Sequence, residues 1–504
     1  MDTLVTDALV VTMDRDAPGA TGDLGILEGG AVGWEDGEIT YVGPAEGVDT
    51  ADAGRTVDGA GCVVLPGLVN AHVHGRQSIV RGAAQDVPEA EWMHGALGPI
   101  AAHATTEDGV VGAKLTALEA LASGTTTVGE YATDVGELVD RVYRPLGLRV
   151  VATETITEIS DASPDTDDDD RAATGDDDRA ATDEDRAATG DDEPPSLDFG
   201  TGEAALDRAE DLFARYVTDP LVEPAYGPQA LDMVSLDLLA EVVDRARSRD
   251  RTVHMHVAQG DRERRAVAER FGSDATTVGV LGDEGLLGDH LLAAHLHGAT
   301  REERARLADA GVRMVGCPSS IAAIDGVVPP IVEYLDHGGH VGIGTDQAPG
   351  PGGHDALREL RTAALLAKTD AGDPTAIDAP GALELATIGG ARALGIDDRV
   401  GSLSVGKRAD VVVCDLERPS VAPTVSRPFH TAIPNLVYGS AGDEVRDVFV
   451  DGVQLVSAGG IVGLDVDEIV AEAVERAERI FADAEADWRA ADSALVDAVE
   501  NGRL

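Results

Sequence analysis

Eight short apolar runs, most of them separated by segments with helical spacing, dominate the centre of this 504-residue chain. Strands that alternate with amphipathic helices indicate a parallel sheet, and eight of them fit a closed (β/α)8 barrel of the TIM type. Polar residues gather at the carboxyl ends of these runs, where barrel enzymes carry their chemistry. The runs are CVVLPGLVNAHVHG, TTTVGEY, RVVATET, VEPAYGP, TVHMHVAQ, HLLAAHLHG, VRMVGCPSS and VGIGTDQ.

The two ends of the chain have a different pattern. Residues 1–65 and 398–460 alternate apolar and polar positions between Gly- and Asp-rich turns, which predicts one small composite β-sandwich domain built from both ends. The barrel then spans residues 66–397, and the Ala- and Glu-rich residues 461–504 predict a C-terminal helical segment.

Within the barrel, residues 161–195 repeat an acidic motif of the form DDDRAATG. Such a tract buries too little apolar surface to offset the entropy of ordering, which predicts a solvated, disordered insertion after the third strand. An arm that binds cations or a partner is the alternative, and we assign the tract no chemistry.

The net charge of −54 shapes the expected environment and partners. Only Lys114, Lys368 and Lys407 are lysines, and the excess of acid is spread over the whole chain, a composition typical of the cytoplasm of salt-accumulating halophiles. Nucleic acid and anionic membranes are therefore poor partners, and a small-molecule substrate is expected.

The cysteines and the first residues indicate the compartment. Cys62, Cys317 and Cys414 form no CxxC pair, so neither a disulfide framework nor a thiolate zinc site is expected. The N-terminal segment is acidic and no apolar run approaches the roughly 20 residues of a membrane span, which predicts a cytoplasmic protein.

The residues that carry the chemistry begin with His72-Val73-His74. Two residues that are two positions apart on a strand lie on the same face, so both imidazoles can point into the barrel mouth. Asp346, at the end of the last run, adds a carboxylate. Imidazoles with a carboxylate suit one divalent metal, zinc or iron, with a position left for water.

Further histidines end the fifth and sixth runs. His254 and His256 repeat the two-residue spacing, which alone does not choose between them. His295 is a further ligand or a neutral imidazole that contacts the substrate or the water, and His297 competes for that role. Packing inside the barrel is the other interpretation of His254 and His297.

With these motifs in place, the chain resembles the amidohydrolase superfamily, in particular its aminohydrolase and chlorohydrolase branch. That branch includes guanine deaminase, the methylthioadenosine and S-adenosylhomocysteine deaminases and the s-triazine hydrolases. The resemblance covers nearly all of the chain except the acidic insertion. It rests on PGLVNAHVHG, SGTTTVGEY, HMHVAQ, AAHLHG, GCPSS, GTDQ and GSLSVGKRADVVVCD.

The resemblance implies a role for each matching position. His72, His74, His256 and Asp346 would hold a single metal, and Asp346 would also accept the proton of the attacking water. His295 would contact that water or the substrate. Relatives of this kind commonly form homodimers, which the resemblance also suggests here.

Gln259 departs from the family pattern, because a glutamate usually ends the H-x-x-E motif that begins at His256. An amide does not titrate, so Gln259 can only orient groups by hydrogen bonding, and protons must come from elsewhere. The segment Gly316–Ile321 also departs from the pattern at its first and last positions.

The predicted function is hydrolysis of a carbon–nitrogen bond, other than a peptide bond, in a nitrogen heterocycle, by a deaminase-type reaction. The alternatives are a cyclic amide hydrolase, a chlorohydrolase, or a catalytically silent metal-binding homologue, which Gln259 makes plausible. Candidate substrate contacts near the predicted mouth are Arg81, Trp92, Gln229 and Ser319.

Overall fold

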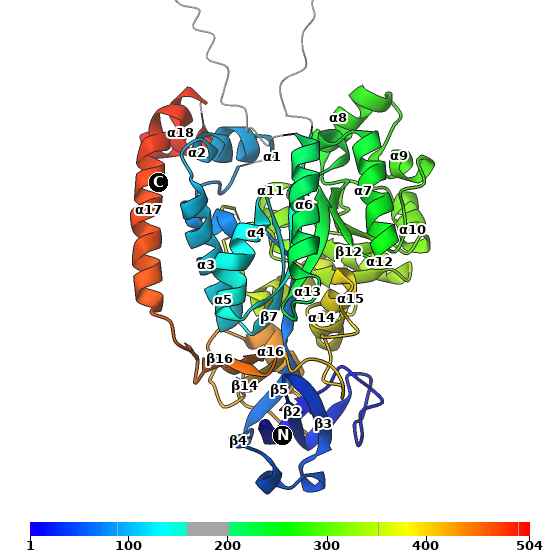
Figure 1. The fold of residues 1–504 in the computed structure, drawn as a ribbon, viewed down its shortest axis with the longest axis vertical. Coiled ribbons are helices and arrows are strands. Elements are labelled where there is room, and N and C mark those ends of the chain that lie inside the picture. Colours follow the sequence, from blue (N-terminus) through cyan, green and yellow to red (C-terminus); the bar gives the residue numbers. More distant parts are fainter. Residues whose placement is uncertain (88, 159–200, 351, 492, 504) are drawn as a thin grey trace, which may run out of the picture.

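A computed structural model describes residues 1–87, 89–158, 201–350, 352–491 and 493–503 (Figure 1). The acidic tract 161–195 lies outside the described residues. The described elements form an eight-stranded parallel barrel and a nine-stranded mixed sheet below it, which confirms the predicted fold class.

The barrel strands follow one another in chain order around the sheet, each parallel to the next. All eight predicted runs contain a strand. The strands are β6 (Leu68–Val73), β7 (Thr125–Ala132), β8 (Arg149–Ile156), β9 (Val222–Pro228), β10 (Val253–Val257), β11 (Leu291–His295), β12 (Arg313–Gly316) and β13 (His340–Ile343).

Helices surround the barrel on the outside (Figure 1). They form because apolar residues recur at helical spacing on the face toward the strands, as in Leu239, Val242, Val243 and Ala246, all buried on one helix. The longer ones are α3 (Thr106–Ala122), α6 (Gly202–Tyr216), α7 (Leu236–Arg249), α8 (Asp261–Phe271), α10 (Arg301–Asp309) and α13 (Ala356–Ala371). Shorter ones include α11 (Pro318–Ile324), α12 (Ile331–Asp336), α14 (Ala379–Leu385) and α15 (Ile388–Leu394).

Small and branched apolar side chains fill the lower interior of the barrel. Val69, Ala71, Ala225, Leu292 and Ala294 belong to one fully buried cluster. This packed floor leaves the carboxyl ends of the strands as the place where polar side chains can converge.

The mixed sheet takes strands from both ends of the chain, as predicted. β5 and β14 are antiparallel neighbours at its centre and join the N-terminal and C-terminal segments. Its strands are β1 (Thr3–Val11), β2 (Ile26–Glu35), β3 (Glu38–Pro44), β4 (Arg55–Asp58), β5 (Cys62–Pro66), β14 (Val411–Asp415), β15 (Val445–Val450), β16 (Val453–Ser457) and β17 (Gly460–Ile461).

A buried ion pair ties the barrel to this sheet. Arg149 at the start of β8 donates from Nε and Nη2 to the two carboxylate oxygens of Asp410, over 2.9 and 2.8 Å. Both side chains are at most 5% exposed, and the bidentate geometry fixes one unit against the other.

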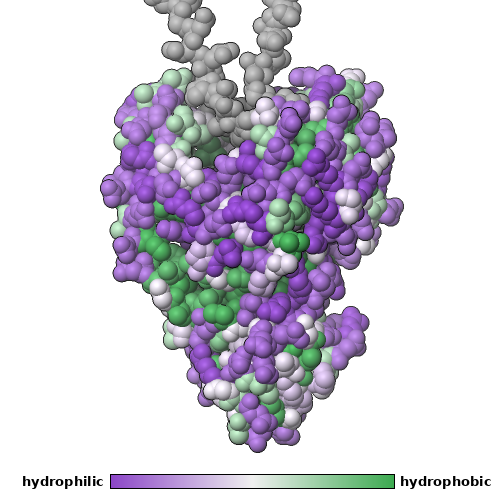
Figure 2. Space-filling view, in the orientation of Figure 1, coloured by the Kyte–Doolittle hydropathy of each residue, from purple (hydrophilic) through white to green (hydrophobic). Residues whose placement is uncertain are grey.

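Two helices, α17 (Val466–Ala490) and α18 (Ala494–Glu500), follow the mixed sheet, and α17 packs beside α3 (Figure 1). Among the helices that the structure describes, none has the length and apolar character needed to cross a membrane. Hydrophilic residues cover most of the face shown in Figure 2.

Candidate metal centre

The first and last strands of the barrel bring His72, His74 and Asp346 together. Nε2 of His72 and Nε2 of His74 each lie 3.4 Å from Oδ1 of Asp346. His72 is fully buried and Asp346 is 6% exposed, so the three groups meet inside the barrel mouth.

Backbone hydrogen bonds at the same place close the barrel. The Asp346 amide donates to the carbonyl of His72 over 2.9 Å, and the His74 amide donates to the carbonyl of Asp346 over 3.0 Å. Asp346 adopts φ +62°, a conformation that is costly for a residue with a side chain and is frequent at functional sites.

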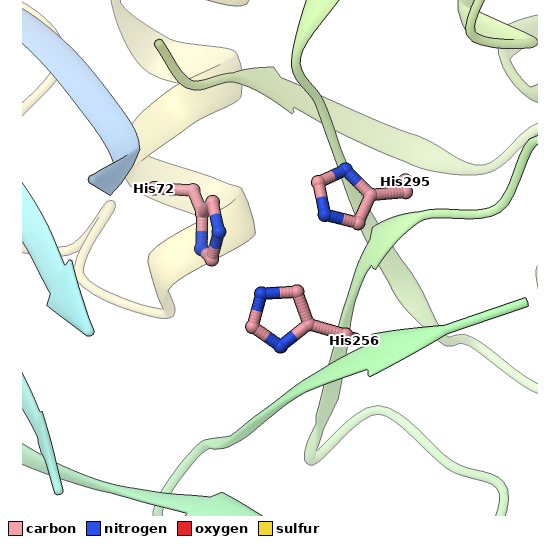
Figure 3. A group of neighbouring side chains, drawn as sticks. All are labelled: His72, His256 and His295. Carbon is pink, nitrogen blue, oxygen red and sulfur yellow. The ribbon is translucent and has the colours of Figure 1, made fainter. Parts of the chain in front are cut away.

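His256 and His295 complete the cluster from the neighbouring strands β10 and β11. The rings of His72, His256 and His295 point toward one another (Figure 3). Ring centroids lie 5.0 Å apart for His72 and His256 and 5.3 Å apart for His256 and His295. One ligand atom from each of the three lies within 4.8 Å of the others, as do atoms of His72, His74 and Asp346.

Carbonyl oxygens set the orientation of two of these rings. Nδ1 of His74 donates to the carbonyl of Tyr131 over 2.9 Å, and Nδ1 of His256 donates to the carbonyl of Gln229 over 3.0 Å. A proton held on Nδ1 leaves the lone pair of Nε2 free for a metal.

His254 orients the third ring. Its Nε2 lies 2.9 Å from Nδ1 of His72, and both side chains are fully buried. Packing inside the barrel is one of the two roles that the sequence predicts for His254. The H-x-H spacing does not predict that the His254 ring contacts His72, which lies on a strand across the barrel.

The pKa values of the clustered side chains favour binding of a cation. Burial lowers the pKa of His74 to about 4 and that of His295 to about 3, and it lowers the pKa of His256 well below its usual range. Burial alone would raise the pKa of Asp346, but the neighbouring histidines lower it below its usual range. The result is a set of neutral imidazoles beside a carboxylate.

These donors fit a divalent metal. Nε2 of His72 is buried with no hydrogen-bond partner among the described residues, although a buried polar atom without a partner costs free energy. Neutral imidazoles and a carboxylate within reach of one point are the donors that divalent transition metals accept.

Ser320, which the sequence did not suggest for this site, orients the carboxylate. Its hydroxyl donates to Oδ2 of Asp346 over 2.5 Å, which leaves Oδ1 toward the histidines. The GCPSS motif in the sequence predicts a substrate contact at its first serine, Ser319, whereas it is the second serine, Ser320, that binds Asp346.

Two of the four predicted substrate contacts are bound to protein groups. Arg81 donates to Oε2 of Glu119 over 2.6 Å and to the carbonyl of Gly352. The amide and hydroxyl of Ser319 both donate to the buried carboxylate of Glu359.

The other two predicted contacts differ. Gln229 carries the carbonyl that orients His256, and Nε1 of Trp92 is buried without a hydrogen-bond partner within the described parts of the chain. The substrate roles of Arg81, Trp92, Gln229 and Ser319 stay predictions.

Gln259 follows β10 beside the cluster. Its backbone amide donates to Oε2 of Glu263 over 2.8 Å, while Nε2 of its side chain is buried with no partner among the residues described. Burial, with a contribution from Asp232, raises the pKa of Glu263 to about 7, but this carboxyl is bound to the Gln259 amide and to the hydroxyl of Thr277.

The fold and the cluster together define a barrel protein with a divalent-metal centre at the carboxyl ends of its strands. The amidohydrolase family model matches residues 63–455, and the chain belongs to this family. It is therefore a hydrolase of carbon–nitrogen bonds other than peptide bonds.

Similar proteins carry more specific names. A 5-methylthioadenosine/S-adenosylhomocysteine deaminase of Syntrophobacter fumaroxidans is 31% identical over 93% of this chain and 96% of its own length. A 5'-deoxyadenosine deaminase of Methanosarcina acetivorans is 31% identical over 96% and 100%. A crystal structure of an adenosine deaminase from Xanthomonas campestris with bound zinc has a TM-score of 0.80 and 29% identity, and covers 95% of this chain and 98% of that one.

Proposed function

We propose that this protein is a zinc-dependent deaminase that removes the exocyclic amino group of an adenine nucleoside modified at its 5' carbon. The observation that carries the proposal is a pair of overlapping groups of possible metal ligands that share His72: one with His74 and Asp346, the other with His256 and His295. Support for the substrate class comes from the names of the similar proteins, and support for zinc comes from the imidazole-rich donor set and from the zinc of the similar structure.

In this proposal His72, His74, His256 and Asp346 hold the metal. The metal supplies a Lewis acid and lowers the pKa of water, so that a nucleophile is available near neutral pH. The neutral imidazoles retain lone pairs for binding because burial keeps their pKa values low.

Asp346 accepts the proton of the attacking water. The hydrogen bond from Ser320 holds the carboxylate in one orientation, with Oδ1 toward the histidines, where it can act as a positioned general base. His295 stabilises the reacting end of the substrate through its unpartnered Nδ1.

The departing amine needs a proton, and Gln259 has none to exchange. Asp346 can return the proton that it accepted, because the amine leaves from the carbon that the water attacked. Gln259 then contributes only orientation, through its amide.

Release of ammonia tests the proposal. Zinc-loaded protein, assayed in concentrated KCl, should release ammonia from 5'-deoxyadenosine or methylthioadenosine and convert the adenine ring to hypoxanthine. Removal of the metal with a chelator should abolish the release, and zinc should restore it.

Three results would contradict this function. Chloride release from a chlorotriazine points to a chlorohydrolase, and a new carboxylate from a cyclic amide points to an amide hydrolase. Zinc binding without turnover of any of these substrates, which Gln259 makes a specific alternative, identifies a catalytically silent homologue.

A further inference from the structure

A series of hydrogen bonds between buried side chains joins the first and last strands of the barrel beside the metal centre. Its members come from β6, from α3 and from the segments that follow His74 and β13, and each is at most 2% exposed. We call the series the buried polar chain. Its members, in the order in which they are bonded, are Asn70, Thr345, His354, Ser78 and Thr116.

Asn70 and Thr345 bind each other at the first end of the buried polar chain. The backbone amide of Thr345 donates to Oδ1 of Asn70 over 3.0 Å, and Nδ2 of Asn70 donates to Oγ1 of Thr345 over 2.8 Å. Asn70 lies two residues before His72, and Thr345 immediately precedes Asp346. The pair therefore links the backbone next to one proposed ligand to the backbone next to another.

His354 connects Thr345 to the segment that follows His74. Its Nδ1 lies 2.8 Å from Oγ1 of Thr345, and its Nε2 lies 3.0 Å from Oγ of Ser78. Ser78 belongs to the 3-10 helix η3 (Gly75–Val80), which begins directly after His74. His354 itself immediately precedes the N-cap residue of α13, so a regular helix fixes the backbone from which the imidazole extends.

Backbone carbonyls set the direction of the hydrogen bonds at the second end. Oγ of Ser78 lies 2.7 Å from Oγ1 of Thr116, and Thr116 donates to the carbonyl of Gly75 over 3.1 Å or to that of Gly112 over 3.3 Å. A carbonyl only accepts, so the single proton of the Thr116 hydroxyl is used there and Thr116 accepts from Ser78. Ser78 in turn accepts from Nε2 of His354.

The first end of the buried polar chain requires the same direction. A backbone amide only donates, so Asn70 accepts from Thr345 through Oδ1 and donates to the Thr345 hydroxyl through Nδ2. That hydroxyl then gives its proton to Nδ1 of His354. Both ends thus require a neutral His354 that carries its proton on Nε2. Burial lowers the pKa of His354 to about 4, so the imidazole is neutral near pH 7.

We propose that His354 is a positioning residue, which sets how the segments that carry His74 and Asp346 lie relative to each other. It acts on these ligands through its hydrogen bonds to Thr345 and Ser78. Without the imidazole, each of the two hydroxyls loses a buried partner, and movement of the two segments toward other partners would relieve that cost. The inference rests on the assignment of His74 and Asp346 as metal ligands in the proposed function.

The zinc affinity of matched variants tests this role. Competition with a chelating dye in concentrated KCl compares His354→Leu with the control His290→Leu. His290 is also buried, but it precedes β11, at the opposite end of the strands from the metal centre, and its Nε2 donates to the carbonyl of Leu286 over 3.2 Å. His354→Leu should weaken zinc binding about tenfold, at the lower end of the range for partners of metal ligands, because it acts through further residues. His290→Leu should change the affinity less than about twofold.

Conservative variants of Thr345 distinguish positioning from a general loss of stability. Thr345→Val keeps the shape of the side chain and removes its hydroxyl, whereas Thr345→Ser keeps the hydroxyl and should bind zinc more tightly than Thr345→Val. The double variant Thr345→Val/His354→Leu should lose much less affinity than the sum of the two single losses, because both substitutions remove the same hydrogen bond.

The outcomes separate this inference from the proposed function. Equal zinc affinities of His354→Leu and His290→Leu, or additive losses in the double variant, would overturn the positioning role, even if the unsubstituted protein releases ammonia. If His354→Leu does not fold, the Thr345 variants decide, and equal affinities of Thr345→Val and Thr345→Ser overturn the role. Zinc binding that weakens as expected in a protein that releases no ammonia would overturn only the proposed function. An unsubstituted protein that binds no zinc would overturn both.

Discussion

His254 holds the ring of His72 through the 2.9 Å contact between its Nε2 and Nδ1 of His72. Partners of this kind fix the tautomer and orientation of a metal-binding histidine. We expect His254→Leu to weaken zinc binding by roughly 10 to 100-fold, whereas His254→Gln, whose amide can reach the same position, should lose less. Competition with a chelating dye measures both affinities, and equal losses in the two variants would contradict this role.

Gln259 is the residue at which the proposed chemistry can be altered directly. Replacement by Glu adds a titratable carboxyl beside the centre, and a general acid–base group contributes roughly 100-fold or more to many enzymes. We expect Gln259→Glu to raise kcat and to add a limb to its pH profile, with Gln259→Met as the control that cannot titrate. A less active Glu variant would show that the pocket depends on the amide.

The sequence could predict the convergence at the metal centre, because strand ends at one rim of a barrel must meet. It could not predict which neighbours orient those residues. The contact of His254 with His72 joins positions 182 residues apart, and Ser319 is bound to Glu359, 40 residues along the chain. Such partners depend on side-chain packing across the barrel, which local patterns do not encode.

At the scale of elements, Asp108 in α3 anchors the C-terminal helix α17. Nη1 of Arg476 lies 3.1 Å from Oδ1 of Asp108, and Nη2 of Arg479 lies 2.5 Å from Oδ2. Asp108 also accepts from Thr105 in a capping box, and its side chain is fully buried. Asp108→Asn should lower the free energy of unfolding by roughly 1–3 kcal/mol.

Asp483→Asn is the control, because the Asp483 carboxylate is 51% exposed and pairs with Arg479 at 3.4 Å. This substitution should lower the free energy of unfolding by at most about 1 kcal/mol. Burial alone would raise the pKa of Asp108, but hydrogen bonds from Thr105, Arg479 and Arg476 lower it to about 2. The contribution of Asp108 is therefore present above its ordinary pKa of 3.8 and is lost as the pH falls toward 2. Denaturant unfolding of both variants and of the unsubstituted protein from pH 6 to pH 2 measures the free energy of unfolding. A loss of stability in Asp108→Asn that persists at pH 2 would contradict this role of Asp108.

The order of the elements was largely predictable, because each barrel strand is a short apolar run bounded by turn residues. The first apolar run is the exception, because it holds two strands that belong to different sheets. CVVLPGLVNAHVHG contains both β5, which belongs to the mixed sheet, and β6, which belongs to the barrel. Both strands are equally apolar in sequence. They are distinguished only by the strands with which they pair in the fold, β14 for β5 and β7 for β6.

At the scale of the whole molecule, the net charge of −54 should make stability depend on salt. Repulsion between like charges destabilises the compact state, and screening reduces it within the first few tenths of a molar. We expect the thermal midpoint of unfolding to rise steeply with KCl. Sucrose, which favours burial without screening charge, is the control. A similar rise in sucrose without salt would show that charge is not the cause.

The backbone bonds among His72, His74 and Asp346 have a consequence for synthesis. Asp346 lies more than two thirds of the way along the chain, so a nascent polypeptide on the ribosome exposes its histidines long before their carboxylate exists. A divalent metal captured at that stage would lack the residue that closes the ring of strands. Correct loading of the metal should thus follow translation of the last barrel strand, and a chain truncated before residue 340 should bind a divalent metal weakly and without defined geometry.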